Sequence, residues 1–168
     1  MTEPPAAQPG AAPPAAPPVV AAADIALLPP AAFRVQRPIR FSHCDPAGIV
    51  YFPNYFDLFN ALVEDWFTRG LGIDYAHTIL KRRLGLPTVH AECDFMRPCW
   101  MGEMLTLGVV VDQVGRSSLR LRIVGEIDGK VRLAGRLVLV TMSLETHTSV
   151  TIPDDLRSTI ERYRATCD

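Results

Sequence analysis

The chain has 168 residues and 48% hydrophobic composition, which is enough for one domain with a buried core. Its formal net charge of −1 and pI near 6.4 give it no overall attraction for nucleic acid or anionic membranes. No apolar run is long enough to span a bilayer. Four cysteines without a CxxC pair favour free thiols in a reducing cytoplasm, and the four scattered histidines predict no metal site.

Residues 1–32 differ from the rest of the chain in composition. Nine of the 15 prolines lie in this segment among alanines, and no lysine or arginine precedes Arg34. Such a composition cannot assemble a packed core, so we predict a disordered or polyproline-like tail. It lacks the basic start of a signal peptide. The folded domain is therefore expected to span residues 33–168.

The first half of this domain predicts one strand followed by helices. Phe33 to Ser42 has the composition of a strand, and Pro38 places it at an edge or a bulge because proline lacks an N–H. Asn54 to Arg69 is the longest helical pattern, with one apolar face and Asn54 as the expected N-cap. A shorter helix is expected from Tyr75 to Arg82. The apolar face of the long helix consists of Tyr55, Leu58, Phe59, Leu62, Val63 and Trp66.

The second half predicts a series of long strands and a terminal helix. Asp128-Gly129 separates two of these strands and is typical of a two-residue hairpin turn. A meander of antiparallel strands that follows one buried helix predicts an α+β layer architecture. The expected strands are Leu86–Phe95, Glu103–Val114, Ser118–Ile127 and Lys130–Glu145, and the expected helix is Pro153–Arg164.

The stretch from Phe41 to Tyr55 joins the first strand to the long helix and carries a carboxylate, Asp45, on a turn. Pro46 restricts the backbone of this turn, and we expect Gly48 to allow a close backbone approach that a Cβ would block. Free N–H groups at a helix start can polarise an oxygen. This arrangement suits attack on an acyl carbon with stabilisation of the oxyanion.

The eleven residues from Asp45 to Tyr55, DPAGIVYFPNY, resemble the active-site loop of the 4-hydroxybenzoyl-CoA thioesterase family. Strand lengths and order extend the resemblance more loosely from Arg34 to Arg164. The resemblance implies a hotdog fold, in which a curved antiparallel sheet wraps around a long central helix. It also implies an acyl-CoA thioesterase that needs no cofactor, because coenzyme A is part of the substrate. The active site would lie at the subunit interface of a homodimer or homotetramer.

The resemblance assigns two catalytic groups. Asp45 would attack the thioester carbonyl or activate a water molecule, since a carboxylate is ionised at neutral pH. The backbone N–H of Phe52 would hold the thioester oxygen. From the residues alone, Asp45 could equally be a turn aspartate that hydrogen-bonds its own backbone. Cys44 is disfavoured as the nucleophile because a neighbouring carboxylate opposes a thiolate.

Other positions are candidates for substrate binding. Tyr51, Phe52 and Tyr55 could line an acyl pocket, although aromatic residues at a helix start often belong to the core. Asn60 stands where the 4-hydroxybenzoyl enzymes carry an acid, which argues against a phenolic substrate. His43 could orient the carboxylate of Asp45.

Coenzyme A brings phosphates that need cations or N–H donors. Arg116 and Ser117 match the zone where the family places its nucleotide contacts, although Arg116 could also be a solvated hairpin residue. Two alternatives to an acyl-CoA thioesterase stay open: a thioesterase for acyl-carrier proteins, and a non-catalytic module that binds acyl-CoA. Asp45 argues against the second alternative, because a binding module needs no carboxylate beside the thioester carbon.

Overall fold

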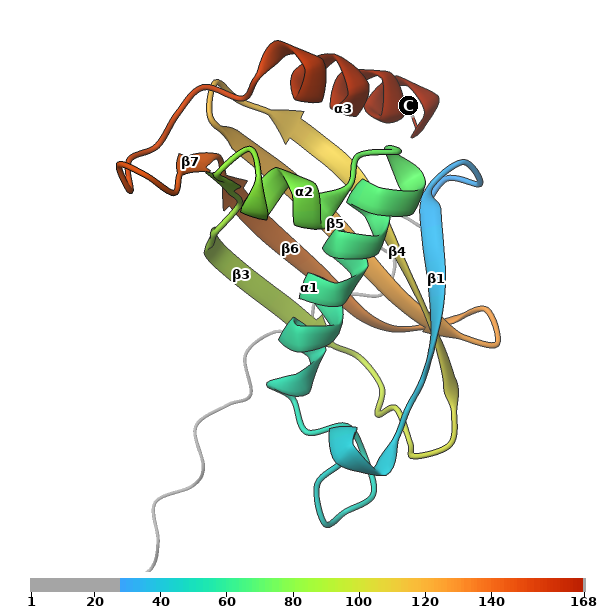
Figure 1. Ribbon diagram of the computed structural model, residues 1–168. Helices are drawn as coiled ribbons and strands as arrows, with labels where there is room; N and C mark the ends of the chain where they lie inside the picture. The colour runs from blue at the N-terminus through green and yellow to red at the C-terminus, as the bar shows by residue number, and fades with distance from the viewer. Residues whose placement is uncertain (1–27, 168) are drawn as a thin grey trace, which may run out of the picture.

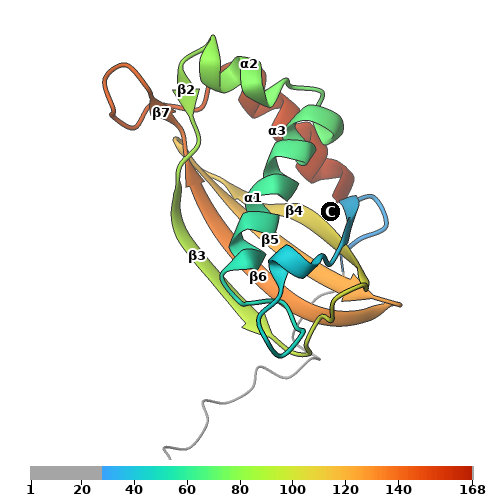
Figure 2. The same ribbon diagram turned by 60° about the horizontal axis from the view of Figure 1, so that its bottom comes forward.

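A five-stranded antiparallel sheet curves around a central helix (Figures 1 and 2) in the computed structural model, which describes residues 28–167. The strand order is β1-β4-β5-β6-β3, and a separate pair joins β2 to β7. The strands are β1 (Phe33–Pro38), β2 (Leu84–Gly85), β3 (Thr88–Phe95), β4 (Met104–Val114), β5 (Ser118–Ile127), β6 (Lys130–Val140) and β7 (Met142–Ser143). The helices are α1 (Asn54–Asp65), α2 (Tyr75–Leu80) and α3 (Asp154–Cys167).

The core lies between α1 and the concave face of the sheet. The apolar face expected for the long helix is buried, and Phe59 and Trp66 are completely shielded from solvent. Gly135 in β6 makes room for this packing, because a Cβ there would lie 2.7 Å from the ring of Phe59. The fold is therefore the α+β arrangement expected from the sequence, with the long helix held against the sheet by its apolar stripe.

Several boundaries differ from those expected. The first strand ends at Pro38, although the Ile39 N–H still bonds to the Glu103 carbonyl, and a 3-10 turn follows at Phe41–His43. Pro53, not Asn54, occupies the N-cap of α1. The α-helical hydrogen bonding stops at Asp65, and a π-helical turn continues to Gly70.

Residues 28–32, the part of the expected tail that the structure describes, lie against the sheet, whereas residues 1–27 lie outside the described range. The guanidinium of Arg34 donates hydrogen bonds of 2.9–3.0 Å to the carbonyls of Leu28, Pro29, Pro30 and Ala32. The Leu28 side chain packs against Gly108 and fills the space that the Cβ of any other residue at position 108 would need. A single arginine therefore anchors this segment on the outer face of the sheet.

Strand β3 forms one edge of the sheet and is exposed along most of its length. Among its apolar side chains, Val89 is 60% exposed and Phe95 is 47% exposed. An edge strand with uncovered apolar side chains favours association with another chain. None of the helices in residues 28–167 has the length and apolar character needed to cross a membrane.

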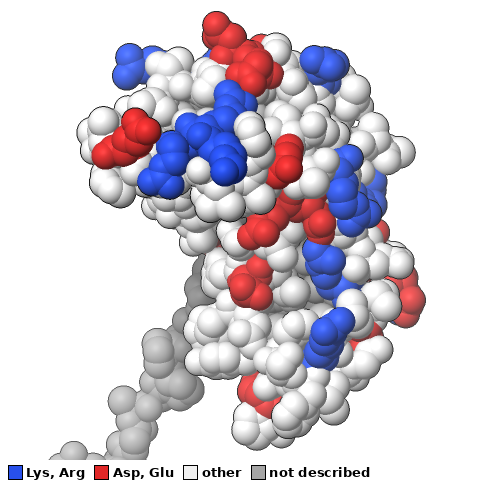
Figure 3. Space-filling model, viewed as in Figure 1, with Lys and Arg blue, Asp and Glu red and all other residues white. Residues whose placement is uncertain are grey.

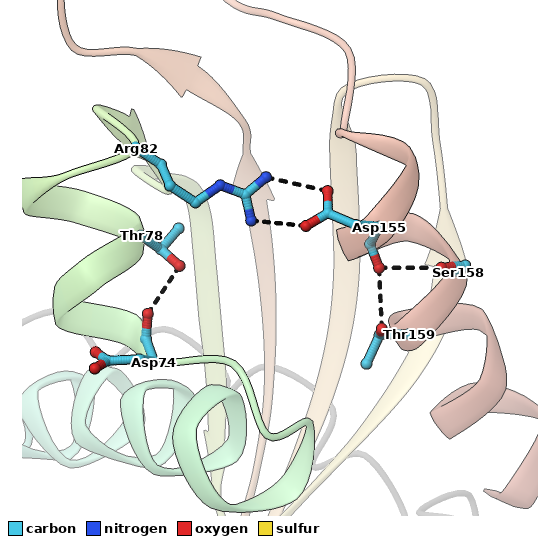
Figure 4. A network of polar contacts seen from close by, with 6 residues as sticks. All are labelled: Asp74, Thr78, Arg82, Asp155, Ser158 and Thr159. Atoms are coloured by element: carbon cyan, nitrogen blue, oxygen red, sulfur yellow. Dashed lines mark hydrogen bonds and ion pairs between the residues drawn. The ribbon is translucent and has the colours of Figure 1, made fainter.

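An ion pair joins the end of α2 to the start of α3 (Figure 4). Arg82 donates two hydrogen bonds to the carboxylate of Asp155, at 2.9 and 3.0 Å. The Asp155 backbone carbonyl also accepts from the Ser158 and Thr159 hydroxyls. The hydrogen bond from Arg82 lowers the pKa of the Asp155 carboxyl.

We predict that Arg82→Gln lowers the free energy of unfolding at pH 7 by less than about 1 kcal/mol, because the pair is largely exposed. A carboxyl whose pKa is lowered by folding stabilises the protein above its unfolded pKa and loses that effect as the pH falls. The difference between wild type and variant should therefore shrink below about pH 4. Urea unfolding at several pH values measures this difference in the free energy of unfolding. A difference that grows toward acid pH would contradict the stabilising role assigned to the Arg82–Asp155 pair.

Candidate active site

The Asp45 loop is a tight backbone turn between the 3-10 turn and α1. Cys44 and Val50 form a bridge across its base, the Asp45 N–H bonds to the Ile49 carbonyl at 3.0 Å, and the Gly48 N–H bonds to the Asp45 carbonyl at 2.9 Å. The expected reason for Gly48 is wrong, because no atom lies within 4 Å of where its Cβ would be. Glycine is needed there because its φ is +78°, a conformation that other residues adopt only with strain.

The loop is fastened to the connection between β3 and β4. The Val50 N–H donates to the Cys99 carbonyl and the Met101 N–H donates to the Gly48 carbonyl, both at 3.0 Å. Figure 2 shows the two segments side by side at the lower end of the molecule. The His43 carbonyl accepts from the Tyr51 N–H and the Asn54 side chain, each at 2.9 Å. The carboxylate therefore sits on a segment held at both ends.

The carboxylate of Asp45 is half-buried and partly engaged by its own turn. Its Oδ1 accepts a hydrogen bond of 2.8 Å from the Ala47 N–H. The turn role considered from the sequence is therefore present. This turn role is compatible with a catalytic role. The bond orients the carboxylate through Oδ1, and within residues 28–167 no hydrogen bond engages the second carboxylate oxygen.

The start of α1 supplies a backbone donor beside this loop. Phe52 precedes the N-cap Pro53, and its carbonyl accepts from the Tyr55 N–H at 3.2 Å. Within the described part of the chain, the Phe52 N–H donates to no acceptor. An unpaired N–H at a helix start is a suitable donor to a developing oxyanion.

A groove of about 430 Å³ lies between the loop, the first turn of α1 and the end of β3. This volume is within the range of about 300–1,000 Å³ that is usual for small-molecule sites. Its lining is apolar except for Arg97. The lining residues are Ile49, Val50, Phe52, Tyr55, Phe95, Met96, Arg97 and Pro98.

The expected aromatic cluster divides between the surface and the core. Tyr51 and Phe52 are about half exposed and pack edge to face at 5.4 Å. Tyr55 is 4% exposed and its ring lies 5.2 Å from that of Phe95. Burial and a hydrogen bond with Cys99 raise the pKa of the Tyr55 hydroxyl, so it stays neutral. Phe52 and Tyr55 line the groove together.

Three other candidates make no hydrogen bond with the Asp45 carboxylate within residues 28–167. The amide of Asn60 donates to Glu64 at 2.8 Å on the exposed face of α1, and Asn60 does not line the groove. His43 accepts from the Arg40 N–H at 3.1 Å through Nδ1, and makes no contact with Asp45 among the hydrogen bonds of residues 28–167. Cys44 donates to the Arg40 carbonyl at 3.4 Å.

Arg116 and Ser117 lie at the other end of the sheet from the groove. They precede Ser118, which is level with the start of β3, whereas the groove is at Phe95, where β3 ends. Eight residues of strand separate these ends by roughly 23 Å. One chain alone therefore does not bring Arg116 and Asp45 together.

Basic side chains gather at the α2 end of the molecule, as Figure 3 shows. The turn after α2 carries three basic residues in sequence, Lys81-Arg82-Arg83, of which Arg82 is paired with Asp155. Within residues 28–167 no group of three or more His, Cys, Asp or Glu residues is arranged to hold a metal ion.

Sequence reasoning missed the Phe95–Pro98 wall of the groove. Phe95 was predicted only as the last residue of a strand, and Arg97 was given no role. No sequence motif marks these residues, because strand pairing brings them to the loop. The Met96 and Arg97 N–H groups bond to the Arg132 carbonyl at 2.9 and 3.1 Å.

Comparison with known proteins identifies the family and the fold. A family model described as "Thioesterase-like superfamily" matches residues 39–160. The gentisyl-coenzyme A thioesterase structure superposes with a TM-score of 0.70 at 22% identity, covering 76% of this chain and 99% of that one. A thioesterase superfamily structure from Jannaschia sp. CCS1 gives 0.76 at 25% identity, covering 82% and 96%. The architecture is the hotdog fold.

Curated relatives are similar over about half of the chain. The 1,4-dihydroxy-2-naphthoyl-CoA hydrolase of Acaryochloris marina is 31% identical over 86 residues, which cover 51% of this chain and 62% of that protein. The 4-hydroxybenzoyl-CoA thioesterase of Pseudomonas sp. (strain CBS-3) is 31% identical over 85 residues, which cover 50% and 60%. The match thus spans less than two thirds of these relatives.

This chain belongs to the thioesterase-like superfamily, since the family model matches well over half of its residues. The family resemblance inferred from the Asp45 loop is confirmed.

We predict that Gly48→Ala destabilises the loop, because alanine at a φ of +78° costs about 1 kcal/mol. The free energy of unfolding in urea should fall by that amount. Gly48→Asn should lose less, because asparagine tolerates left-handed backbone better than alanine. Equal stability of the alanine variant and wild type would show that this conformation is not required.

Proposed function

We propose that this protein hydrolyses the thioester of an acyl-CoA, with an aromatic acyl group, to a free acid and coenzyme A. The observation that carries the proposal is that the Asp45 carboxylate and the Phe52 N–H lie on one anchored segment, which also contributes Ile49, Val50 and Phe52 to the lining of an apolar groove. The relatives named above act on CoA thioesters of aromatic acids, which supports both the reaction and the acyl class.

The proposed reaction needs only water and the thioester. The Phe52 N–H binds the carbonyl oxygen and stabilises the negative charge that develops there. Asp45 either attacks the carbonyl carbon, giving an anhydride that water then cleaves, or removes a proton from an attacking water molecule. In both routes the carbon–sulfur bond breaks and the thiolate of coenzyme A leaves and takes up a proton. No resident cofactor enters either route.

We further propose that the working unit is a homodimer or a homotetramer, with the active site at the subunit interface. Two copies related by a twofold axis can pair their β3 edges only in antiparallel orientation. Such pairing brings the Thr88 end of one copy toward the Phe95 end of the other. It would therefore carry the Arg116 and Ser117 turn of one copy toward the groove of the other, where these residues could contact the nucleotide of coenzyme A.

A location in the cytoplasm fits this proposal, because acyl-CoA substrates and reduced cysteines share that compartment. All four cysteines, Cys44, Cys93, Cys99 and Cys167, are free thiols.

Thiol release from aryl-CoA and alkyl-CoA thioesters tests the proposed reaction. Wild type should release thiol, and Asp45→Asn should reduce kcat by at least about a thousandfold, because the amide keeps the shape but can neither attack nor take a proton. The folded variant should still bind acyl-CoA. Asp57→Asn, on the exposed part of α1, is the matched control and should stay active. Full activity of Asp45→Asn would refute the role of Asp45.

The proposed interface is tested at an exposed position of β3. Val89→Lys places a charge on a side chain that is 60% exposed, so the fold of a single chain should be unaffected. We predict that its native mass falls to the 18.5 kDa of one chain and that thiol release is lost. A variant that keeps a multimeric mass, or a monomeric variant with full activity, would contradict an active site at this interface.

A further inference from the structure

Arg97 is the charged exception in the groove, which is otherwise lined by apolar side chains. Arg97 is exposed, and no carboxylate within residues 28–167 lies within ion-pairing distance of it. Arg132, whose carbonyl accepts from the Arg97 N–H, is by contrast paired with Glu103 at 3.1 Å. An arginine without a carboxylate partner beside an apolar groove is a candidate for binding an anion of a ligand.

The backbone that carries Arg97 is held rigidly. The Met96 and Arg97 N–H groups both donate to the Arg132 carbonyl, and the Arg132 guanidinium donates to the Pro98 carbonyl at 2.7 Å. The next residue, Cys99, accepts the hydrogen bond from Val50 in the Asp45 loop. The backbone of Arg97 is therefore held in the connection that also binds the Asp45 loop, and little backbone ordering is needed when a ligand binds.

The chemistry of the groove suits a ligand that is apolar with one anionic end. Phe95 stacks against the neutral Tyr55, and together with Phe52 they offer aromatic surface to a planar group. A hydrogen bond between a guanidinium and a negatively charged oxygen is charge-assisted and stronger than one between neutral groups. Arg97 offers such a bond in the planar, two-pronged geometry that matches a carboxylate or a phosphate.

We propose that Arg97 is a specificity residue that binds an anionic oxygen group of the substrate in this groove. The inference rests on the proposed thioester hydrolysis. The oxygen group belongs either to the acyl part, as a carboxylate on its ring, or to a phosphate of coenzyme A. Both sources share the chemistry that Arg97 recognises, and the choice of thioester separates them.

The test compares Arg97→Gln with wild type on three thioesters: benzoyl-CoA, 4-carboxybenzoyl-CoA and S-benzoyl pantetheine, which carries neither a phosphate nor a carboxylate. Loss of a charge-assisted hydrogen bond should raise KM about tenfold with little change in kcat. If a phosphate is bound, KM rises for both CoA thioesters. If the ring carboxylate is bound, it rises only for 4-carboxybenzoyl-CoA. In either case KM for S-benzoyl pantetheine stays unchanged.

Arg120→Gln is the matched control, because Arg120 is an exposed arginine near the start of β5 and does not line the groove. The inference is overturned if Arg97→Gln leaves KM unchanged for both CoA thioesters, or raises it equally for S-benzoyl pantetheine. It is also overturned if the variant changes the native mass, since Arg97 would then serve the contact between copies.

A binding measurement separates this inference from the proposed reaction. Calorimetric titration of Asp45→Asn, with and without Arg97→Gln, uses coenzyme A and terephthalate as probes and needs no turnover. About tenfold weaker binding of either probe to the double variant supports the role of Arg97 even if wild type hydrolyses no thioester. Equal binding of both probes to the two variants refutes it, whatever the outcome of the hydrolysis assay.

Discussion

Two backbone hydrogen bonds between the Asp45 loop and the connection from β3 to β4 are the constraint on which the site depends. They join Val50 to Cys99 and Gly48 to Met101, and so fix one wall of the groove against the other. The loop carries Asp45 and leads into Phe52, whereas the connection carries Arg97. The position of the carboxylate relative to the groove is thus set by the sheet and not by the loop alone, because β3 delivers the connection to this place.

Much of the fold could be predicted from local patterns. The apolar face from Tyr55 to Trp66 predicted the central helix, and Asp128-Gly129 predicted the hairpin that joins β5 to β6, where both residues have positive φ. Local patterns could not show that β3 is an edge strand, since alternation does not reveal which neighbours a strand has. They also could not show that Arg34 holds Leu28 to Ala32, because this contact depends on the space above Gly108.

The candidate site was predicted only in part, because local sequence patterns do not show contacts between distant segments. The loop from Asp45 to Tyr55 is contiguous in sequence, so its turn, its carboxylate and its helix start could all be inferred together. Arg97 was missed because it reaches the groove through pairing of β3 with β6. The sequence could place Arg116 on a hairpin turn but could not show its distance from Asp45. In the structure Arg116 precedes β5, at the end of the sheet opposite the groove. Its proposed role consequently depends on a second copy of the chain.

The central claim is that the thioester carbonyl lies between the Asp45 carboxylate and the Phe52 N–H. A crystal structure of Asp45→Asn with a bound aryl-CoA tests it most directly. The account predicts the carbonyl oxygen at about 2.7–3.1 Å from the Phe52 nitrogen, with the carbonyl carbon facing the side chain of residue 45. An acyl group bound outside this groove, or a carbonyl oxygen held by other donors, would contradict the account.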